Sequence, residues 1–227
     1  MNKPRIVIKL SGSIFNFETD FKLLNDYINI IKKINEIYQP LIITGGGKIA
    51  RFYINLSRSL GFDESGLDLM GIQVSHLNAK LFISGLGDLC FPLTPHNLDE
   101  ISTAVITNKI VITGGLYPGQ STNATSALIA EKINAVKFFN ATDVDGIFNL
   151  DPRTHPNATM YESIDVKECI RILKVENSMA GTYDLMDLIS LKVIERSRLP
   201  TVVFKSSVDN LKKIILDHVK MGTEIII

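Results

Sequence analysis

Three glycine-rich segments each follow an apolar run and carry hydroxyl or cationic side chains beside the glycines. They read "KLSGS" at 9–13, "GGGK" at 45–48 and "GGLYPGQST" at 114–122. Glycine lets the backbone approach a ligand closely, and successive N–H groups can bind an anion. The middle segment has neither the spacing of a P-loop nor that of a dinucleotide fingerprint. Each segment alone is also typical of a tight strand-to-helix turn, but three together indicate a phosphate site of another kind.

Cations accompany two of these segments. Lys9 lies inside the apolar run 5–10, where an unpaired ammonium is costly to bury, so its side chain either reaches a phosphate or extends to water. Lys48 and Arg51 are three residues apart on the helix expected after the second segment and therefore share a face, with Lys48 expected to matter less than Lys9. Each segment also leads toward a helix whose N-terminus favours anions. Two phosphorylated ligands, or one long polyphosphate, would suit such a site.

The elements that position these segments alternate along the chain. Apolar β-branched runs predict strands at 5–10, 40–44, 109–113, 135–141, 200–205 and 223–227. Apolar residues spaced three and four apart predict helices, the first opened by Asp20, that contain Leu24, Ile28 and Ile31; Met70, Val74, Leu77 and Leu81; Ala124, Ala127 and Leu128; Leu185, Leu188, Ile189 and Val193; and Leu211, Ile214 and Ile215. This alternation predicts a mostly parallel sheet covered on both faces, with the three segments at one edge.

Composition limits the class of protein. The 227 residues carry 24 acidic and 24 basic side chains, so no electrostatic footprint for nucleic acid is visible. The apolar run near the start is too short for a signal peptide or a membrane span, and the two cysteines, Cys90 and Cys169, fit buried thiols in a reducing compartment. We expect a cytoplasmic protein with one compact domain of two lobes, about 1–136 and about 137–227.

A further segment, "FFNATDVDGIFNLDPR" at 138–153, has two readings. Asp145-Gly146 and Asp151-Pro152 are turn and loop signals on their own. Alternatively, the segment holds a nucleotide base and ribose, with Thr142 offering a hydroxyl, Phe148 an aromatic face and Asp151 a carboxylate.

With these stretches identified, the sequence resembles the amino acid kinase superfamily, and within it the archaeal-type uridylate (UMP) kinase branch. The resemblance rests on motifs that run in the family's order and span nearly the whole chain: "IKLSGS", "ITGGGKIARFYI", "LDLMGIQVSHLNA" (67–79), "VITGGLYPGQSTNATSALIAE" (111–131), "ATDVDGIFNLDPR" (141–153) and "AGTYDLMDLISLKVIERS" (180–197). The third motif together with "GGLYPGQST" is the most specific to the UMP-using branch. The resemblance implies a three-layer αβα sandwich around a mostly parallel sheet of about eight strands.

The resemblance also implies roles for individual residues. Lys9 would be the catalytic residue, and Asp68 would accept hydrogen bonds from the UMP ribose, although an aspartate there could instead be a helix N-cap. The residues that would bind ATP are Lys9, Leu10, Ser11, Gly12, Ser13, Gly47, Arg51, Thr142, Phe148 and Asp151. The residues that would bind UMP are Gly46, Asp68, Leu116, Tyr117, Pro118, Gly119, Gln120, Ser121 and Thr122.

The activity implied is the phosphorylation of UMP to UDP by ATP, in pyrimidine nucleotide synthesis. Mg²⁺ would be carried by the ATP phosphates, without a dedicated protein metal site. The family resemblance also implies UTP as a candidate feedback inhibitor. The protein would form a homohexamer, a trimer of dimers. No general base is required, because the second pKa of a phosphate monoester is about 6. The four histidines lie outside the glycine segments and form no nucleophile or metal-ligand pattern.

Two departures and two rival functions accompany this reading. Relatives often have tyrosine where this chain has Phe148, and many carry an aspartate that organises catalytic lysines where it has Asn123. One rival is another small-molecule kinase of this fold, acting on carbamate, an acylated amino acid or isopentenyl phosphate. The other is a non-catalytic nucleotide-binding protein.

Overall fold

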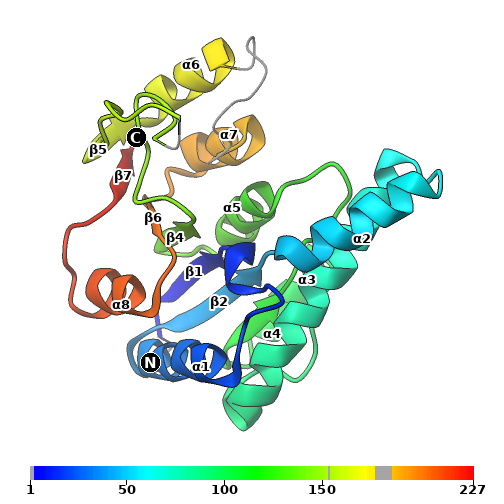
Figure 1. Cartoon of the computed structure of the whole chain (residues 1–227). Coiled ribbons are helices and arrows are strands. Elements are labelled where there is room, and N and C mark those ends of the chain that lie inside the picture. The colour runs from blue at the N-terminus through cyan, green and yellow to red at the C-terminus, as the bar shows by residue number, and fades with distance from the viewer. Residues whose placement is uncertain (1–2, 153, 177–185) are drawn as a thin grey trace.

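A computed structural model describes residues 3–152, 154–176 and 186–227 (Figure 1). Its strands are β1 (Arg5–Leu10), β2 (Gln39–Thr44), β3 (Val111–Thr113), β4 (Lys137–Thr142), β5 (Ser163–Asp165), β6 (Thr201–Lys205) and β7 (Thr223–Ile226). Its helices are α1 (Phe21–Ile37), α2 (Gly47–Ser59), α3 (Glu64–Leu86), α4 (Leu98–Val105), α5 (Thr122–Lys132), α6 (Val166–Glu176), α7 (Leu188–Ser197) and α8 (Val208–Leu211). The last of these continues into a π-helical turn, η3 (Lys212–Leu216).

The strands form one seven-stranded sheet in the order β3-β2-β1-β4-β6-β7-β5, in which only the β6–β7 pair is antiparallel. The chain builds outward from β1 on one side with β2 and β3, then crosses to the other side with β4. Ligands in open α/β sheets bind outside the carboxyl ends of the strands at such a reversal. The mostly parallel sheet predicted from the sequence is confirmed, and β1, the interior strand from which the order reverses, carries Lys9.

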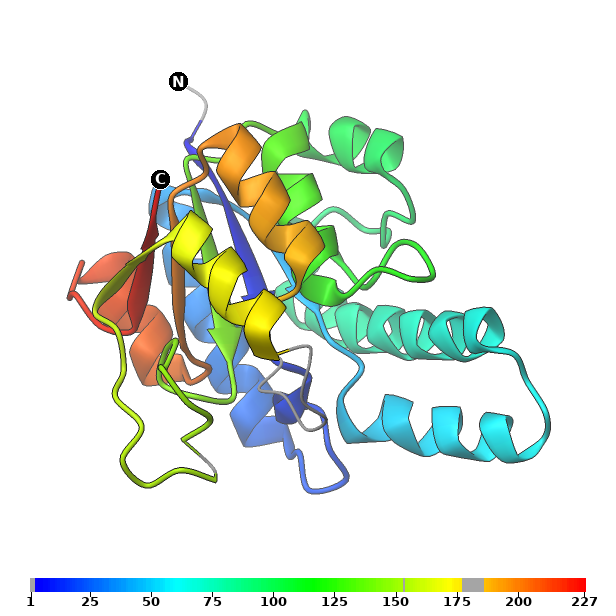
Figure 2. The ribbon, with the colours of Figure 1, turned by 90° about the horizontal axis from the view of Figure 1, so that it is seen from above.

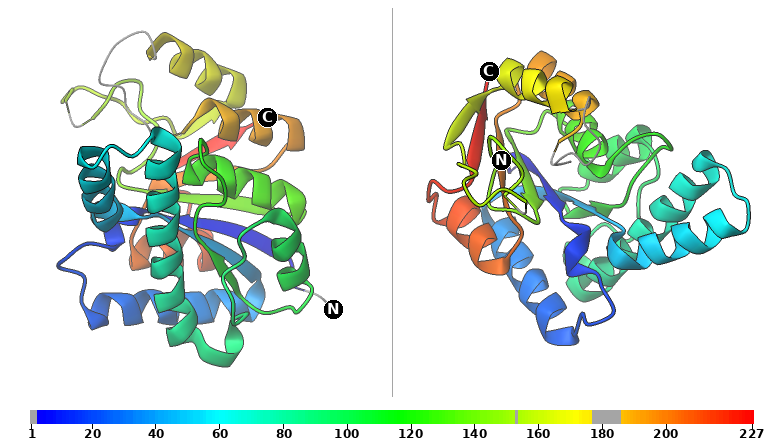
Figure 3. Two further views of the ribbon diagram at one scale, coloured as in Figure 1. Left: turned by 90° about the vertical axis from the view of Figure 1, so that its right-hand side faces the viewer. Right: turned by 45° about the horizontal axis from the view of Figure 1, so that its top comes forward.

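Helices cover both faces of the sheet, which gives the expected three layers (Figures 1 and 3). One apolar core lies between the sheet and α4, α5, α6 and α7, and the other lies between the sheet and α1, α3, α8 and η3. The strands β1, β2 and β4 contribute to both cores, because successive side chains of a strand point to opposite faces. No helix within the described ranges is long and apolar enough to cross a membrane.

The helices α2 and α3 run side by side as a hairpin that extends away from the sheet (Figures 2 and 3). The apolar face predicted for α3 is partly wrong, because Leu77 and Leu81 are exposed while Leu67, Phe82 and Leu86 are buried. The face that packs on the sheet contains buried Ser, His and Asn side chains instead. The spacing of apolar residues alone therefore does not identify this face as the buried one.

The other predicted helices differ in detail. Asp20 caps α1 as expected, accepting the Leu23 N–H at 2.8 Å. The fourth predicted helix is α7, but it starts at Leu188 with Asp187 as its cap, and Leu185 lies outside the described residues. The elements α4, α6 and β5 were not predicted.

Candidate active site

The first and second glycine loops, at the ends of β1 and β2, are in direct backbone contact. A Cβ atom built on Gly12 would lie 2.5 Å from the Gly47 nitrogen, and one on Gly47 would lie 2.1 Å from the Gly12 carbonyl oxygen. Gly47 also has a φ of 66°, which side-chain-bearing residues rarely adopt. Only glycine allows these two loops to meet, so their convergence is confirmed.

The third glycine loop, after β3, approaches the same place along α3. A Cβ atom on Gly114 would lie 2.2 Å from the Ser75 hydroxyl oxygen, which shows how closely this loop packs on the helix. The next residue, Gly115, donates its N–H to that same oxygen at 2.9 Å. The three loops therefore gather at the carboxyl edge of β1, β2 and β3.

Together the loops enclose a pocket of about 370 Å³. Ten of the residues predicted to bind ATP or UMP line it: Lys9, Ser11, Gly12, Ser13, Gly46, Gly47, Arg51, Asp68, Gln120 and Thr122. The lining residues to which we assigned no role are Gly45, Ala50, Ile54, Gly71, Ile72, Ser75, Gly115 and Asp143. The pocket thus combines backbone N–H groups with two cations and two carboxylates.

The two cations enter the pocket from different elements. Lys9 comes from the carboxyl half of β1, where it pairs in register with Ile43 of β2 and Asn140 of β4. Arg51 comes from the first turns of α2, whereas Lys48 is exposed and does not line the pocket. The lower importance expected for Lys48 stays a prediction.

The loops differ in how they lead into helices. The second enters α2 and the third enters α5, so two helix N-termini adjoin the loops as predicted. The same prediction was wrong for the first loop, which enters only a single 3-10 turn, Gly12–Ile14, while α1 starts at Phe21. In that turn Ser11 accepts hydrogen bonds from the N–H and hydroxyl of Ser13, at 3.2 and 2.9 Å.

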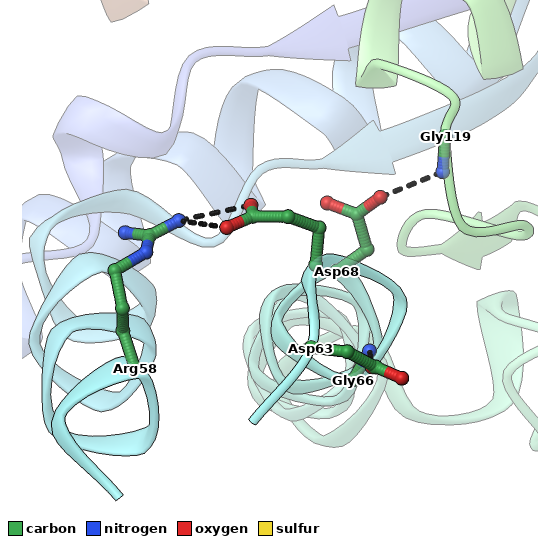
Figure 4. Close-up of polar contacts among 6 residues, drawn as sticks. Arg58, Asp63, Gly66, Asp68 and Gly119 are labelled. Carbon is green, nitrogen blue, oxygen red and sulfur yellow. Dashed lines mark hydrogen bonds and ion pairs between the residues drawn. The ribbon is translucent and has the colours of Figure 1, made fainter. Parts of the chain in front are cut away.

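Asp68 links α3 to the third loop. One carboxylate oxygen accepts the Gly119 N–H at 2.7 Å, and Figure 4 shows this side chain directed at the loop from the second turn of α3. The N-cap of α3 is Asp63, which accepts the Gly66 N–H at 2.7 Å. The alternative reading of Asp68 as a helix cap is therefore wrong.

The remaining residues of the predicted acceptor loop have separate surroundings. Leu116 is buried in the core, whereas Tyr117 and Pro118 are exposed. Ser121 caps α5 through its hydroxyl, which also hydrogen-bonds the carboxylate of Asp187, the cap of α7. The loop is thus anchored in the core at one end and to the other lobe at the opposite end.

The predicted donor residues beyond the pocket lining follow β4. Thr142 is buried and donates to the Asp143 carboxylate at 3.0 Å, while Phe148 is half-buried against the core and pairs with Met160 in an isolated bridge. Asp151 accepts backbone hydrogen bonds through its carbonyl group in the turn that follows. Leu10 is fully buried, so only its backbone is available to a ligand.

The loop that carries Phe148 is held by a residue that sequence reasoning missed. The hydroxyl of Thr223 on β7 accepts the Ile147 N–H at 2.8 Å and donates to the Tyr161 carbonyl at 2.5 Å. A buried threonine in a strand of isoleucines was the available signal. Asn123, at the aspartate position of many relatives, is buried in the first turn of α5.

A three-layer α/β sandwich, with glycine loops and cations gathered at the carboxyl edge of its sheet, is the arrangement of a small-molecule kinase. The model of the amino acid kinase family matches residues 4–205. The chain belongs to the amino acid kinase family.

Relatives within this family cover nearly the whole chain. A uridylate kinase of Methanobrevibacter smithii is 38% identical over 98% of this chain and 99% of its own, and one of Sulfurisphaera tokodaii is 40% identical over 88% of each. Among solved structures, uridylate kinase from Archaeoglobus fulgidus matches with a TM-score of 0.87 and 33% identity, covering 97% of this chain and 99% of that one. UMP kinase from Ureaplasma parvum, 23% identical with a TM-score of 0.82 over the full length of both chains, shares the fold.

Proposed function

We propose that this protein transfers the γ-phosphoryl group of ATP to UMP, giving ADP and UDP, as a step of pyrimidine nucleotide synthesis. The observation that carries the proposal is the convergence of three glycine loops, with Lys9 and Arg51, on one pocket. The names and full-length coverage of the uridylate kinase relatives support the choice of acceptor. The two lobes, 1–136 and 137–227, would bind acceptor and donor respectively.

The two nucleotides would meet at the second glycine loop. Gly46 would face UMP, together with Asp68 and the loop 116–122. Gly47 would face ATP, together with Lys9, the loop 10–13 and Arg51, while Thr142, Phe148 and Asp151 would hold the adenosine. The close contact between Gly12 and Gly47 supports the donor side of this division, because both residues are assigned to ATP.

The reaction we propose is a direct in-line displacement. An oxygen of the UMP phosphate attacks the γ-phosphorus of ATP, the bond from that phosphorus to the β–γ bridging oxygen breaks, and ADP leaves. The attacking oxygen is largely deprotonated near neutral pH because its pKa is about 6, so no general base is needed. Lys9 would neutralise the charge that spreads over the transferred group, and the backbone N–H groups would hold the two anions in line.

Mg²⁺ would travel with ATP, since this ion keeps several waters and binds through one or two carboxylates and the substrate phosphates. The pocket suits this mode, because its lining contains the carboxylates of Asp68 and Asp143. Each of these carboxylates also accepts a hydrogen bond, Asp68 from the Gly119 N–H and Asp143 from the Thr142 hydroxyl, and their remaining oxygens would bind the ion or one of its waters. When bound, the ion would supply positive charge to the phosphates.

The protein would assemble into a homohexamer, a trimer of dimers, as the family resemblance implies. Exposed apolar side chains on the α2–α3 hairpin support an interface there: Phe52, Tyr53, Leu56, Leu60, Phe62, Leu69, Leu77 and Leu81. Light scattering coupled to size-exclusion chromatography tests this assembly, and a monomer at micromolar concentration would contradict it.

An acceptor panel tests the function. The protein is incubated with ATP and Mg²⁺ and with UMP, CMP, AMP, carbamate, an acylated amino acid or isopentenyl phosphate, and ADP formation is followed. We expect UMP to give the highest kcat/KM, and UTP, added to the UMP reaction, reports on feedback. Faster turnover of a carboxylate or of isopentenyl phosphate would favour the rival kinases, and nucleotide binding without turnover would favour a non-catalytic protein.

A further inference from the structure

The sheet-facing side of α3 buries three polar side chains. Ser75, His76 and Asn78 are 2%, 6% and 4% exposed, although they face a core that otherwise holds Ala79 and Phe82 of the same helix. Burying polar groups is costly unless each finds a hydrogen-bond partner. Each of the three side chains hydrogen-bonds backbone groups of a glycine loop, and this is the property that they share.

Gly115, in the third loop, has both of its backbone polar groups bound by α3. Its N–H donates to the Ser75 hydroxyl oxygen at 2.9 Å, and its carbonyl lies 2.9 Å from Nε2 of His76. A carbonyl oxygen only accepts, so Nε2 of His76 carries the proton. The Ser75 hydroxyl in turn donates to the Ile72 carbonyl at 2.6 Å. The orientation of both peptide planes at Gly115 is therefore set by two side chains.

The surroundings of His76 favour the neutral ring that makes this bond. Burial, and then the nearby His96 ring, lower the pKa of His76 below its ordinary value. The two rings stack with their centroids 4.2 Å apart, and Nδ1 of His76 has no hydrogen-bond partner among the described residues. The one directed bond of this side chain is the one to Gly115.

Asn78 plays the equivalent part for the second loop. Its amide nitrogen donates to the Gly45 carbonyl at 2.8 Å and lies 3.5 Å from the Gly46 carbonyl. Thr44, at the end of β2, donates to the Ser75 and Thr113 carbonyls at 2.8 and 3.2 Å, which joins the second strand, the helix and the third strand. One turn of α3 thus fixes two of the three loops.

We propose that Ser75, His76 and Asn78 are positioning residues that set the phosphate-binding geometry of the second and third loops through α3. The inference rests on the proposed function, in which the third loop serves UMP alone and the second serves both nucleotides. Loss of the His76 or Ser75 bond should therefore weaken the use of UMP selectively. Loss of the Asn78 bond should weaken the use of both substrates.

The kinetic test compares matched variants. His76→Leu removes the Nε2 donor and His76→Gln keeps one, while Ser75→Ala removes the hydroxyl and Ser75→Thr keeps it. Because an unsatisfied buried group costs about 1–3 kcal/mol, His76→Leu and Ser75→Ala should raise the KM for UMP by about tenfold and leave the KM for ATP within about twofold. His76→Gln and Ser75→Thr should recover most of this loss. Asn78→Ala should raise both KM values.

A second measurement needs no substrate. Amide hydrogen exchange of the ligand-free protein should show Gly115 exchanging at least about tenfold faster in Ser75→Ala than in the wild type, because its N–H loses its acceptor. Should His76→Leu fail to fold, Ser75→Ala, which removes a single oxygen atom, carries the kinetic test as well.

The outcomes separate this inference from the proposed function. A wild type that does not phosphorylate UMP overturns the proposed function, and the exchange measurement still decides the positioning roles. Unchanged Gly115 exchange in Ser75→Ala overturns the inference, as does a parallel rise in both KM values in Ser75→Ala and His76→Leu. Selective loss of UMP affinity with recovery in the conservative variants supports it.

Discussion

Asp68 offers the sharpest test of how the acceptor is held. Its carboxylate accepts the Gly119 N–H at 2.7 Å, and in the proposed function it also accepts from the ribose of UMP. Asp68→Ala removes both interactions, while Asp68→Asn keeps an acceptor oxygen and loses the charge. The change lies on one solvent-exposed face of α3, so the fold should be unaffected.

The magnitude follows from the kind of bond that is lost. A hydrogen bond to a charged group contributes about 1.5–3 kcal/mol, and an exposed one falls at the lower end of this range. The substitution to alanine should therefore raise the KM for UMP by roughly tenfold, since each 1.4 kcal/mol corresponds to a factor of ten. The KM for ATP should stay within about twofold, and asparagine should fall between alanine and the wild type.

The assay is steady-state ADP formation, with each substrate varied at saturating levels of the other. Glu64→Ala is the matched control, because Glu64 is also an exposed carboxylate of α3 but pairs with Arg58 at 3.0 Å. It should leave both KM values unchanged. Equal rises in the two KM values for Asp68→Ala, or an effect no larger than that of Glu64→Ala, would refute the ribose assignment.

Four further predictions concern catalysis and stability. Lys9→Ala should lower kcat by several orders of magnitude without lowering Tm. Lys48→Ala, at an exposed position outside the pocket, should leave kcat unchanged. Wild-type turnover in Lys9→Ala would show that Lys9 has no part in the mechanism. Gly47→Ala should destabilise the fold by about 2 kcal/mol or more and lower Tm by roughly 4–8 °C. The control is Gly61→Ala: Gly61 also has a positive φ, but a Cβ atom there would meet no atom within 4 Å, so Tm should fall less. Equal Tm shifts in the two variants would contradict the loop contact. Burial raises the pKa of the Cys90 and Cys169 thiols to about 12, so a thiol reagent should react at pH 8 only after the protein unfolds. The stability that these thiols contribute below about pH 9 should be lost as the pH rises toward 12, because the unfolded chain releases the thiol protons first. Rapid labelling of the native protein would count against buried thiols. The kcat/KM for UMP should rise through about pH 6 and then level off, as the acceptor phosphate loses its second proton, and continued dependence on a group of the free enzyme near pH 7 would point to a general base.

The sequence was sufficient where one short pattern determines one element. Lys9 inside an apolar run, with glycines directly after it, predicted a strand whose lysine either reaches a phosphate or extends to water, and in the structure Lys9 lines the pocket. The same reasoning placed the three glycine loops at one edge, because parallel strands end on the same side.

The sequence was insufficient where polar groups occupy core positions. Ser75, His76 and Asn78 lie on the buried side of α3 while Leu77 and Leu81 are exposed, which is the reverse of what hydropathy predicts. Their burial depends on hydrogen bonds to the backbone of loops that are distant in the chain. A single sequence does not show which side chain bonds which loop. The segment 180–197 shows a different limit, since part of it lies outside the described residues.

The central claim is that adjacent glycines of one loop face two different nucleotides. A crystal structure with UMP and a non-hydrolysable ATP analogue tests it most directly. We predict the UMP phosphate at the Gly46 N–H and the third loop, the γ-phosphate at Gly47 and Lys9, and the ribose of UMP at Asp68. Both nucleotides on the same side of this loop, or UMP bound away from the third loop, would contradict it.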